Sequence, residues 1–133
     1  MSDPRQRVLY VPAGRGRSYD MGGMQAQFLA DSEETADTYS ISEWWLDAGQ
    51  AGPGPHSHDA NDDIFYVLEG TMTFLAGDET IHAEKGAFLR VPPGVVHDFS
   101  NTSQARAGVL NIYIPGGFEP DMAAIVAWFQ ANR

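Results

Sequence analysis

The sequence predicts an all-β domain, a sandwich or small barrel, that ends in one α-helix. Short runs rich in β-branched and aromatic residues recur along the chain, and Gly, Pro and Asp separate them. Many short strands at such spacing are typical of sandwiches and small barrels. With 133 residues, of which 43% are hydrophobic, the chain is long enough for one domain with a real core.

The first predicted segment is a polar N-terminal arm over residues 1–20. Its Arg15-Gly16-Arg17 run is too short to indicate a nucleic-acid site, so we expect an arm that crosses the surface or pairs with a partner subunit. Strands are expected after the arm. They are residues 24–30, 38–46, 64–75 with a break at Gly70, 80–83, 87–91 and 107–114.

Turn-forming residues separate these strands. Residues 47–55 contain three Gly and two Pro and are predicted to form a loop. Residues 76–79, Ala-Gly-Asp-Glu, predict a hairpin turn, and Pro92-Pro93-Gly94 predicts another turn.

The last segment, from Glu119 to Asn132, has a different pattern. Apolar residues recur there at i, i+3, i+4 and i+7, which predicts an amphipathic helix. Pro120 suits the first turn of this helix, and Trp128 lies beside its apolar stripe. The stripe consists of Met122, Ile125, Val126 and Phe129.

Charge and composition exclude several classes of protein. A net charge of −10, from 8 basic and 18 acidic residues, disfavours DNA, RNA and anionic membranes as partners. Because there is no cysteine, disulfides, thiolate metal ligands and cysteine nucleophiles are excluded. The N-terminus lacks a signal-peptide run, and no stretch approaches the ~20 apolar residues of a membrane-spanning helix. We therefore expect a soluble, cytoplasmic protein.

Three of the four histidines stand in two stretches that look like metal half-sites. His56 and His58 are two residues apart, so on a strand both rings can point into the same space. His97 follows the Pro-Pro-Gly turn on another strand, and Asp63 has the parity to face the interior if it opens the next strand. Three imidazoles and a carboxylate suit zinc, copper, iron or nickel and leave open positions for chemistry. His82 lacks such a context and is predicted to be a surface residue.

The two stretches resemble the two motifs of the cupin superfamily. The first motif, G-x5-H-x-H-x3-4-E-x6-G, is matched by His56, His58, Asp63 and Gly70. The second motif, G-x5-P-x-G-x2-H-x3-N, is complete, with Gly86, Pro92, Gly94, His97 and Asn101. The resemblance spans roughly residues 40 to 115. It implies a double-stranded β-helix, a jelly-roll cupin barrel with a metal inside.

Two positions depart from the family's pattern. Gln50 stands where the family has its first glycine, which indicates a slightly different loop. Asp63 stands in place of the usual glutamate and is one methylene shorter. It could bind the metal directly, reach it through water, or drop out and leave a three-histidine site, and Asp59 and Asp62 are neighbouring alternatives. We favour Asp63 because its spacing to the flanking motif residues fits.

The resemblance implies one divalent transition metal per chain, with Fe, Ni, Mn, Cu and Zn as candidates. Its ligands would be His56, His58, Asp63 and His97. Residues 63–70 and 112–119 resemble small single-domain cupins related to quercetin dioxygenases. This finer resemblance implies a dioxygenase for a small enol or phenolic substrate, with Asp63 as ligand, general base or both. A redox-neutral isomerase, cyclase or lyase of a small carbonyl compound and a non-catalytic small-molecule-binding cupin stay open as alternatives.

Four residues near the motifs are candidates for a substrate pocket: Trp44, Phe65, Phe99 and Asn111. Strand alternation puts only one of Trp44 and Trp45 inside, and Phe65 has the same parity as the candidate carboxylate. Asn111 lies among apolar residues of the last strand and needs hydrogen-bond partners if it is buried. For each of the four, ordinary barrel packing or a solvent-facing position is the simpler alternative.

The domain organisation follows from these elements. We expect residues 1–37 to form the N-terminal arm and first strands, 38–118 the cupin barrel with the metal site, and 119–133 the C-terminal helix, all within one domain. The resemblance implies a small-molecule substrate, and we expect no nucleic-acid or membrane partner. The arm and the edge strands suit a homodimer.

Overall fold

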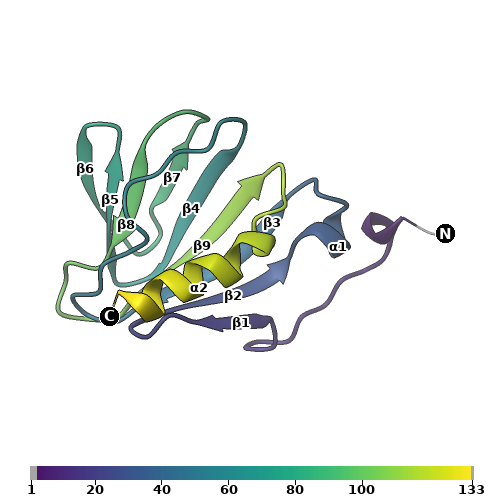
Figure 1. Ribbon diagram of the computed structural model, residues 1–133, viewed down its shortest axis with the longest axis horizontal. Coiled ribbons are helices and arrows are strands. Elements are labelled where there is room, and N and C mark those ends of the chain that lie inside the picture. Colours follow the sequence, from purple (N-terminus) through teal and green to yellow (C-terminus); the bar gives the residue numbers. More distant parts are fainter. Residues whose placement is uncertain (1–2, 133) are drawn as a thin grey trace.

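Two antiparallel sheets make up the body of the protein (Figure 1). The computed structural model describes residues 3–132, so residues 1, 2 and 133, at the ends of the predicted arm and helix, lie outside the described range. The larger sheet has the strand order β1-β2-β3-β9-β4-β7, and the smaller sheet has the order β6-β5-β8. The predicted all-β class with one C-terminal helix is confirmed.

The strands are β1 (Arg17–Asp20), β2 (Met24–Ala30), β3 (Ser40–Leu46), β4 (Asp62–Glu69), β5 (Thr71–Ala76), β6 (Glu79–Glu84), β7 (Phe88–Val91), β8 (His97–Ser100) and β9 (Ala107–Ile114). The α-helices are α1 (Ser32–Thr35) and α2 (Met122–Ala131), and short 3-10 helices are η1 (Pro4–Gln6) and η2 (Glu119–Asp121). Between residues 3 and 132, no helix has the length and apolarity that crossing a bilayer requires.

The predicted break at Gly70 is where the chain leaves the larger sheet for the smaller one. Gly70 has φ +69°, and a Cβ atom there would lie 2.5 Å from the carbonyl oxygen of Arg106. Both the left-handed backbone and this close approach favour glycine. The predicted strand 64–75 is therefore two strands, β4 and β5, which belong to different sheets.

The N-terminal arm is shorter than the predicted residues 1–20, because residues 17–20 form the edge strand β1. Arg17 donates hydrogen bonds to Glu34 and Glu119, each at 2.7 Å, and these contacts tie the strand to distant segments. Strand β1 has only four residues, most of them polar, so its sequence has no apolar alternation from which a strand could be predicted. The short helix α1 is a second element that the sequence did not predict.

Aromatic side chains from both sheets form much of the core. It contains Phe28, Trp44, Phe65, Phe74 and Phe99, all at most 5% exposed. The rings of Trp44 and Phe99 meet edge to face at 5.8 Å, and those of Phe65 and Phe99 are tilted at 5.7 Å, within the range of favourable aromatic pairs. Trp45 points to the opposite side of the sheet, where the Arg106 guanidinium lies 4.1 Å from its ring. The alternation predicted for the two tryptophans is therefore present.

Helix α2 packs on the body through the stripe expected from the sequence. Met122 and Phe129 are buried, and Ile125 and Val126 pack against the core while partly exposed. Trp128, beside the stripe, is 53% exposed. In Figure 1 the helix lies in front of the larger sheet, beside β2 and β1.

A buried carboxylate holds the segment that precedes helix α2. Asp31 is 1% exposed and accepts hydrogen bonds from the N–H groups of Gly117 and Glu119. Glu119 in turn accepts hydrogen bonds from Arg17 at 2.7 Å and from the Tyr19 hydroxyl at 2.6 Å. Burial alone would raise the pKa of Glu119, but these two donors outweigh it and lower the pKa. Segments from both ends of the chain therefore meet in one polar network.

We expect Asp31→Ala to lower the free energy of unfolding by about 2–3 kcal/mol, because two N–H donors would lose a buried acceptor. Urea unfolding followed by tryptophan fluorescence measures this change. Glu33→Ala, at an exposed position of α1, is the matched control and should change stability by less than about 0.5 kcal/mol. Equal effects of the two substitutions would contradict the anchoring role of Asp31.

Candidate metal centre

Backbone hydrogen bonds join the two histidine stretches. The N–H of His56 donates to the carbonyl of His97 at 2.9 Å, and the N–H of His97 donates to the carbonyl of His56 at 2.8 Å. The N–H of Gly94 donates to the carbonyl of His58 at 2.8 Å. The loop that carries His56 and His58 is therefore held against the Pro-Pro-Gly turn and the first residue of β8.

The prediction that His56 and His58 share a strand is wrong. They lie in the loop between β3 and β4, and only His56 makes a β-bridge, an isolated one to His97. Pro53 and Pro55 lack the N–H groups that a continuous ladder needs. The two rings still face the same space, because the bridge fixes one of them and the Gly94 contact fixes the backbone of the other.

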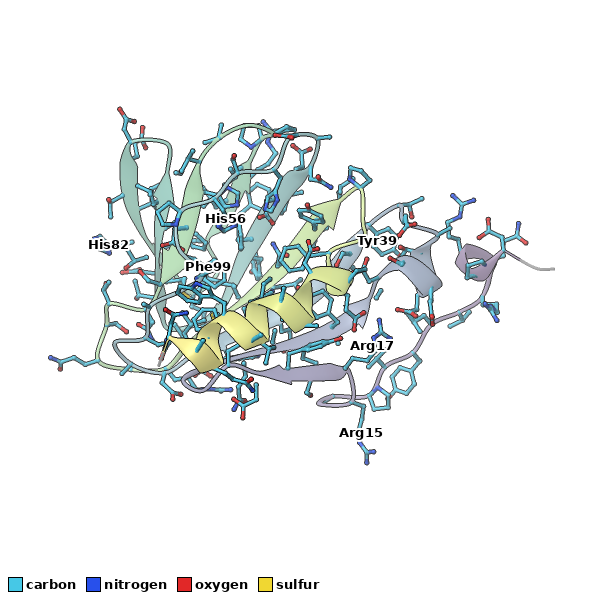
Figure 2. All side chains as sticks on the ribbon, viewed as in Figure 1. Arg15, Arg17, Tyr39, His56, His82 and Phe99 are labelled. Atoms are coloured by element: carbon cyan, nitrogen blue, oxygen red, sulfur yellow. The ribbon has the colours of Figure 1, made fainter. Side chains whose placement is uncertain are left out.

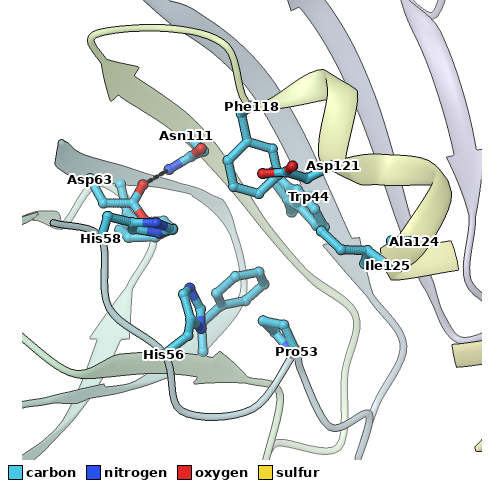
Figure 3. A pocket seen from close by; sticks show the side chains of 12 residues that line it. Trp44, Pro53, His56, His58, Asp63, Asn111, Phe118, Asp121, Ala124 and Ile125 are labelled. Carbon is cyan, nitrogen blue, oxygen red and sulfur yellow. Dashed lines mark hydrogen bonds and ion pairs between the residues drawn. The ribbon is translucent and has the colours of Figure 1, made fainter. Parts of the chain in front are cut away.

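Four side chains converge at this point: His56, His58, Asp63 and His97. One nitrogen or oxygen atom from each lies within 4.8 Å of the others, which is close enough for one ion to contact all four. Asp63 Oδ2 is 2.9 Å from His97 Nε2 and 3.4 Å from His58 Nε2. Asp63 and His97 are buried, whereas His56 and His58 are partly exposed and line a cavity (Figure 3).

The histidine rings are held in tautomers that suit a metal. Nδ1 of His56 lies 2.7 Å from the carbonyl of Gly54, and Nδ1 of His97 lies 2.9 Å from the carbonyl of Val95. A carbonyl only accepts, so Nδ1 carries the proton in both rings and the Nε2 atom of each faces the cluster. Burial lowers the pKa of His56, which favours the neutral imidazole that metals bind.

His58 gives the clearest sign of a missing partner. Its Nε2 atom is buried and makes no well-aligned hydrogen bond within residues 3–132, since the nearest acceptor, Asp63 Oδ2, lies 3.4 Å away. Its Nδ1 atom lies 3.3 Å from the Tyr113 hydroxyl, which can accept the Nδ1 proton. That tautomer would leave the Nε2 lone pair free for a metal. Buried polar atoms are normally satisfied, and a cation held by the cluster would satisfy this one.

Asp63 is fixed as a carboxylate by its neighbours. Asn111 Nδ2 donates to Asp63 Oδ1 at 2.6 Å and to the Ile64 carbonyl at 3.1 Å. Burial raises the pKa of Asp63, but contacts with His58, His97 and Asn111 outweigh burial and lower the pKa to about 2. One oxygen therefore faces the histidines while Asn111 holds the other. Three imidazole nitrogens and one carboxylate oxygen form a donor set that fits a divalent transition metal.

The cluster lies at the inner end of a cavity of about 380 Å³. All four candidate pocket residues, Trp44, Phe65, Phe99 and Asn111, line this cavity. The other side of the cavity was not predicted; it is formed by Pro53, Phe118, Asp121, Ala124 and Ile125. Asp121, Ala124 and Ile125 follow the i, i+3, i+4 spacing of one helix face, a signal that was available in the sequence. Nothing in the local sequence indicated that Tyr113 would contact His58.

A comparison with known families is decisive for the fold. The model of the Cupin domain matches residues 43–113, more than half of the chain. The chain belongs to the cupin family. The two-sheet barrel is therefore the jelly roll that the motifs predicted.

The relatives of this cupin include an enzyme, an uncharacterized protein and a solved structure. Quercetin 2,3-dioxygenase of Bacillus subtilis is 35% identical over 65 residues, which cover 49% of this chain but only 19% of that enzyme. An uncharacterized protein of Streptomyces coelicolor is 31% identical over 83 residues, 62% of this chain and 71% of the relative. The structure of KdgF from Halomonas sp. superimposes with a TM-score of 0.74 at 18% identity, covering 86% of this chain and 99% of that one.

We expect His58→Ala to lower the metal affinity of this cupin at least about tenfold, because one of four donors is removed. The metal bound after reconstitution with zinc or nickel, and the rise in melting temperature that it causes, measure the loss. His82→Ala is the matched control, since His82 is exposed on β6 and lies far from His56 (Figure 2). If His82→Ala lost as much metal as His58→Ala, the site would lie elsewhere.

Proposed function

We propose that this cupin is a metal-dependent dioxygenase that acts on a small enol or phenol. The observation that carries the proposal is an aromatic-walled cavity whose inner end is the cluster of three histidines and one aspartate. The similarity to quercetin 2,3-dioxygenase supports it, since that similarity extends over about half of the chain.

His56, His58, His97 and Asp63 would hold the metal. The orphaned Nε2 of His58 and the mixed nitrogen and oxygen donor set support this assignment. When bound, a divalent transition metal supplies Lewis acidity toward a substrate oxygen and a template for orienting the substrate.

The other cavity residues position the substrate. Trp44, Phe65 and Phe99 are at most 5% exposed and would pack against a flat ring while excluding water from the cluster. Asp63 is the carboxylate at the inner end of the cavity, and its lowered pKa keeps it charged, so we assign it as a metal ligand. Asn111 keeps Asp63 in position through its 2.6 Å hydrogen bond.

The same donor set would also serve a redox-neutral isomerase, cyclase or lyase, and the cavity alone would serve a binding protein. Metal analysis of protein purified without chelator, combined with oxygen uptake on a panel of enols and polyphenols, separates these functions. We expect near-stoichiometric iron, nickel, manganese or copper and oxygen consumption. Stoichiometric zinc without oxygen uptake would support the redox-neutral chemistry, and no metal even after reconstitution would leave only a binding role.

We expect Asp63→Asn to lower the rate of oxygen uptake by about 100-fold or more, because the substitution removes the charged ligand of the metal. Asp59→Asn is the matched control, since Asp59 is an exposed carboxylate of the same loop. The control should keep its activity. If Asp59→Asn were inactive and Asp63→Asn active, the carboxylate would be assigned wrongly.

A further inference from the structure

The charges around the cavity are unevenly distributed. Of the titratable residues that line it, Asp63 is buried and His56 and His58 are half-buried, whereas Asp121 is exposed, so the cluster marks the inner end and Asp121 the mouth. Among the residues that the structure describes, no lysine or arginine lines the cavity. The remaining walls are apolar or aromatic, apart from Asn111, whose amide is used by Asp63. An anionic group on a ligand would therefore find no cationic side chain between the mouth and the metal cluster.

Asp121 stands where helix α2 begins, next to the cavity mouth. It is exposed, and its carboxylate does not cap the helix. Figure 3 shows the carboxylate on the cavity side of the helix, and Asp121 lines the cavity together with Phe118. Ile125 lies one turn further along the same face of the helix. A ligand that approaches the cluster past this helix therefore passes a negative charge first.

We propose that Asp121 is a specificity-determining residue that excludes anionic ligands from the cavity. The substrate would then be a small, flat molecule with no charged group besides the hydroxyl that meets the cluster. The physical reason is twofold: an anionic group that does not reach the metal would lose its hydration among aromatic walls without gaining a cation, and Asp121 would repel it at the mouth. This inference rests on the proposed function, because it concerns ligands of the same cavity.

Direct binding under argon tests this inference without requiring turnover. The probes are 4-methylcatechol and 3,4-dihydroxybenzoate, which differ mainly in one carboxylate, and the zinc-loaded full-length protein is titrated with each by calorimetry. We expect the wild type to prefer the methyl compound. Asp121→Lys should shrink that preference about three- to tenfold, and the change should fade at high ionic strength.

Asp78→Lys is the matched control, because it makes the same charge change at an exposed position of the β5–β6 turn. It should change the preference less than Asp121→Lys does. The inference is overturned if Asp121→Lys leaves the preference unchanged, if both variants change it equally, if the wild type prefers the benzoate, or if neither catechol binds. Selective binding with no oxygen uptake would instead contradict only the proposed function.

Discussion

The reciprocal backbone hydrogen bonds between His56 and His97 are the constraint on which the site depends. The loop with His56 and His58 has no ladder of its own, and its prolines prevent one. The bridge ties this loop to β8, and the carbonyls of Gly54 and Val95 then orient two of the rings. Hydrogen bonds to the protein backbone therefore orient the rings of His56 and His97, which reduces the loss of side-chain freedom that metal binding would cost.

The aspartate in place of the family's glutamate shows how the fold compensates for a shorter side chain. Asp63 is the second residue of β4 and is paired on both sides, with Val91 of β7 and with Tyr113 of β9. A strand held from both sides has little freedom to move away, and Asp63 Oδ2 still comes within 2.9 Å of His97 Nε2. Spacing in the sequence pointed to Asp63 rather than Asp59 or Asp62, because side chains alternate along a strand and the face of each residue follows from its position in the strand.

Local patterns predicted the strands, the break at Gly70, the apolar stripe of α2 and the residues that converge at the cluster. Hydrophobic periodicity, turn-forming residues and motif spacing each depend on residues that are close together in the sequence. The elements that were missed depend on distant partners. Strand β1 is held partly by contacts of Arg17 with Glu34 and Glu119. Tyr113 meets His58, and helix α2 closes one side of the cavity, only once the sheets have packed. No local pattern encodes such contacts.

Strand β9 shows how strand register determines the site. Asn111 and Tyr113 are buried and contact Asp63 and His58, whereas Leu110 and Ile112 alternate with them and face outward. A slip of one residue in its pairing would exchange the two sets and turn Asn111 and Tyr113 outward. Asp63 would then lose the amide that holds one of its oxygens, and His58 would lose the hydroxyl beside its Nδ1 atom. The register of β9 between β3 and β4 is therefore a condition for the cluster.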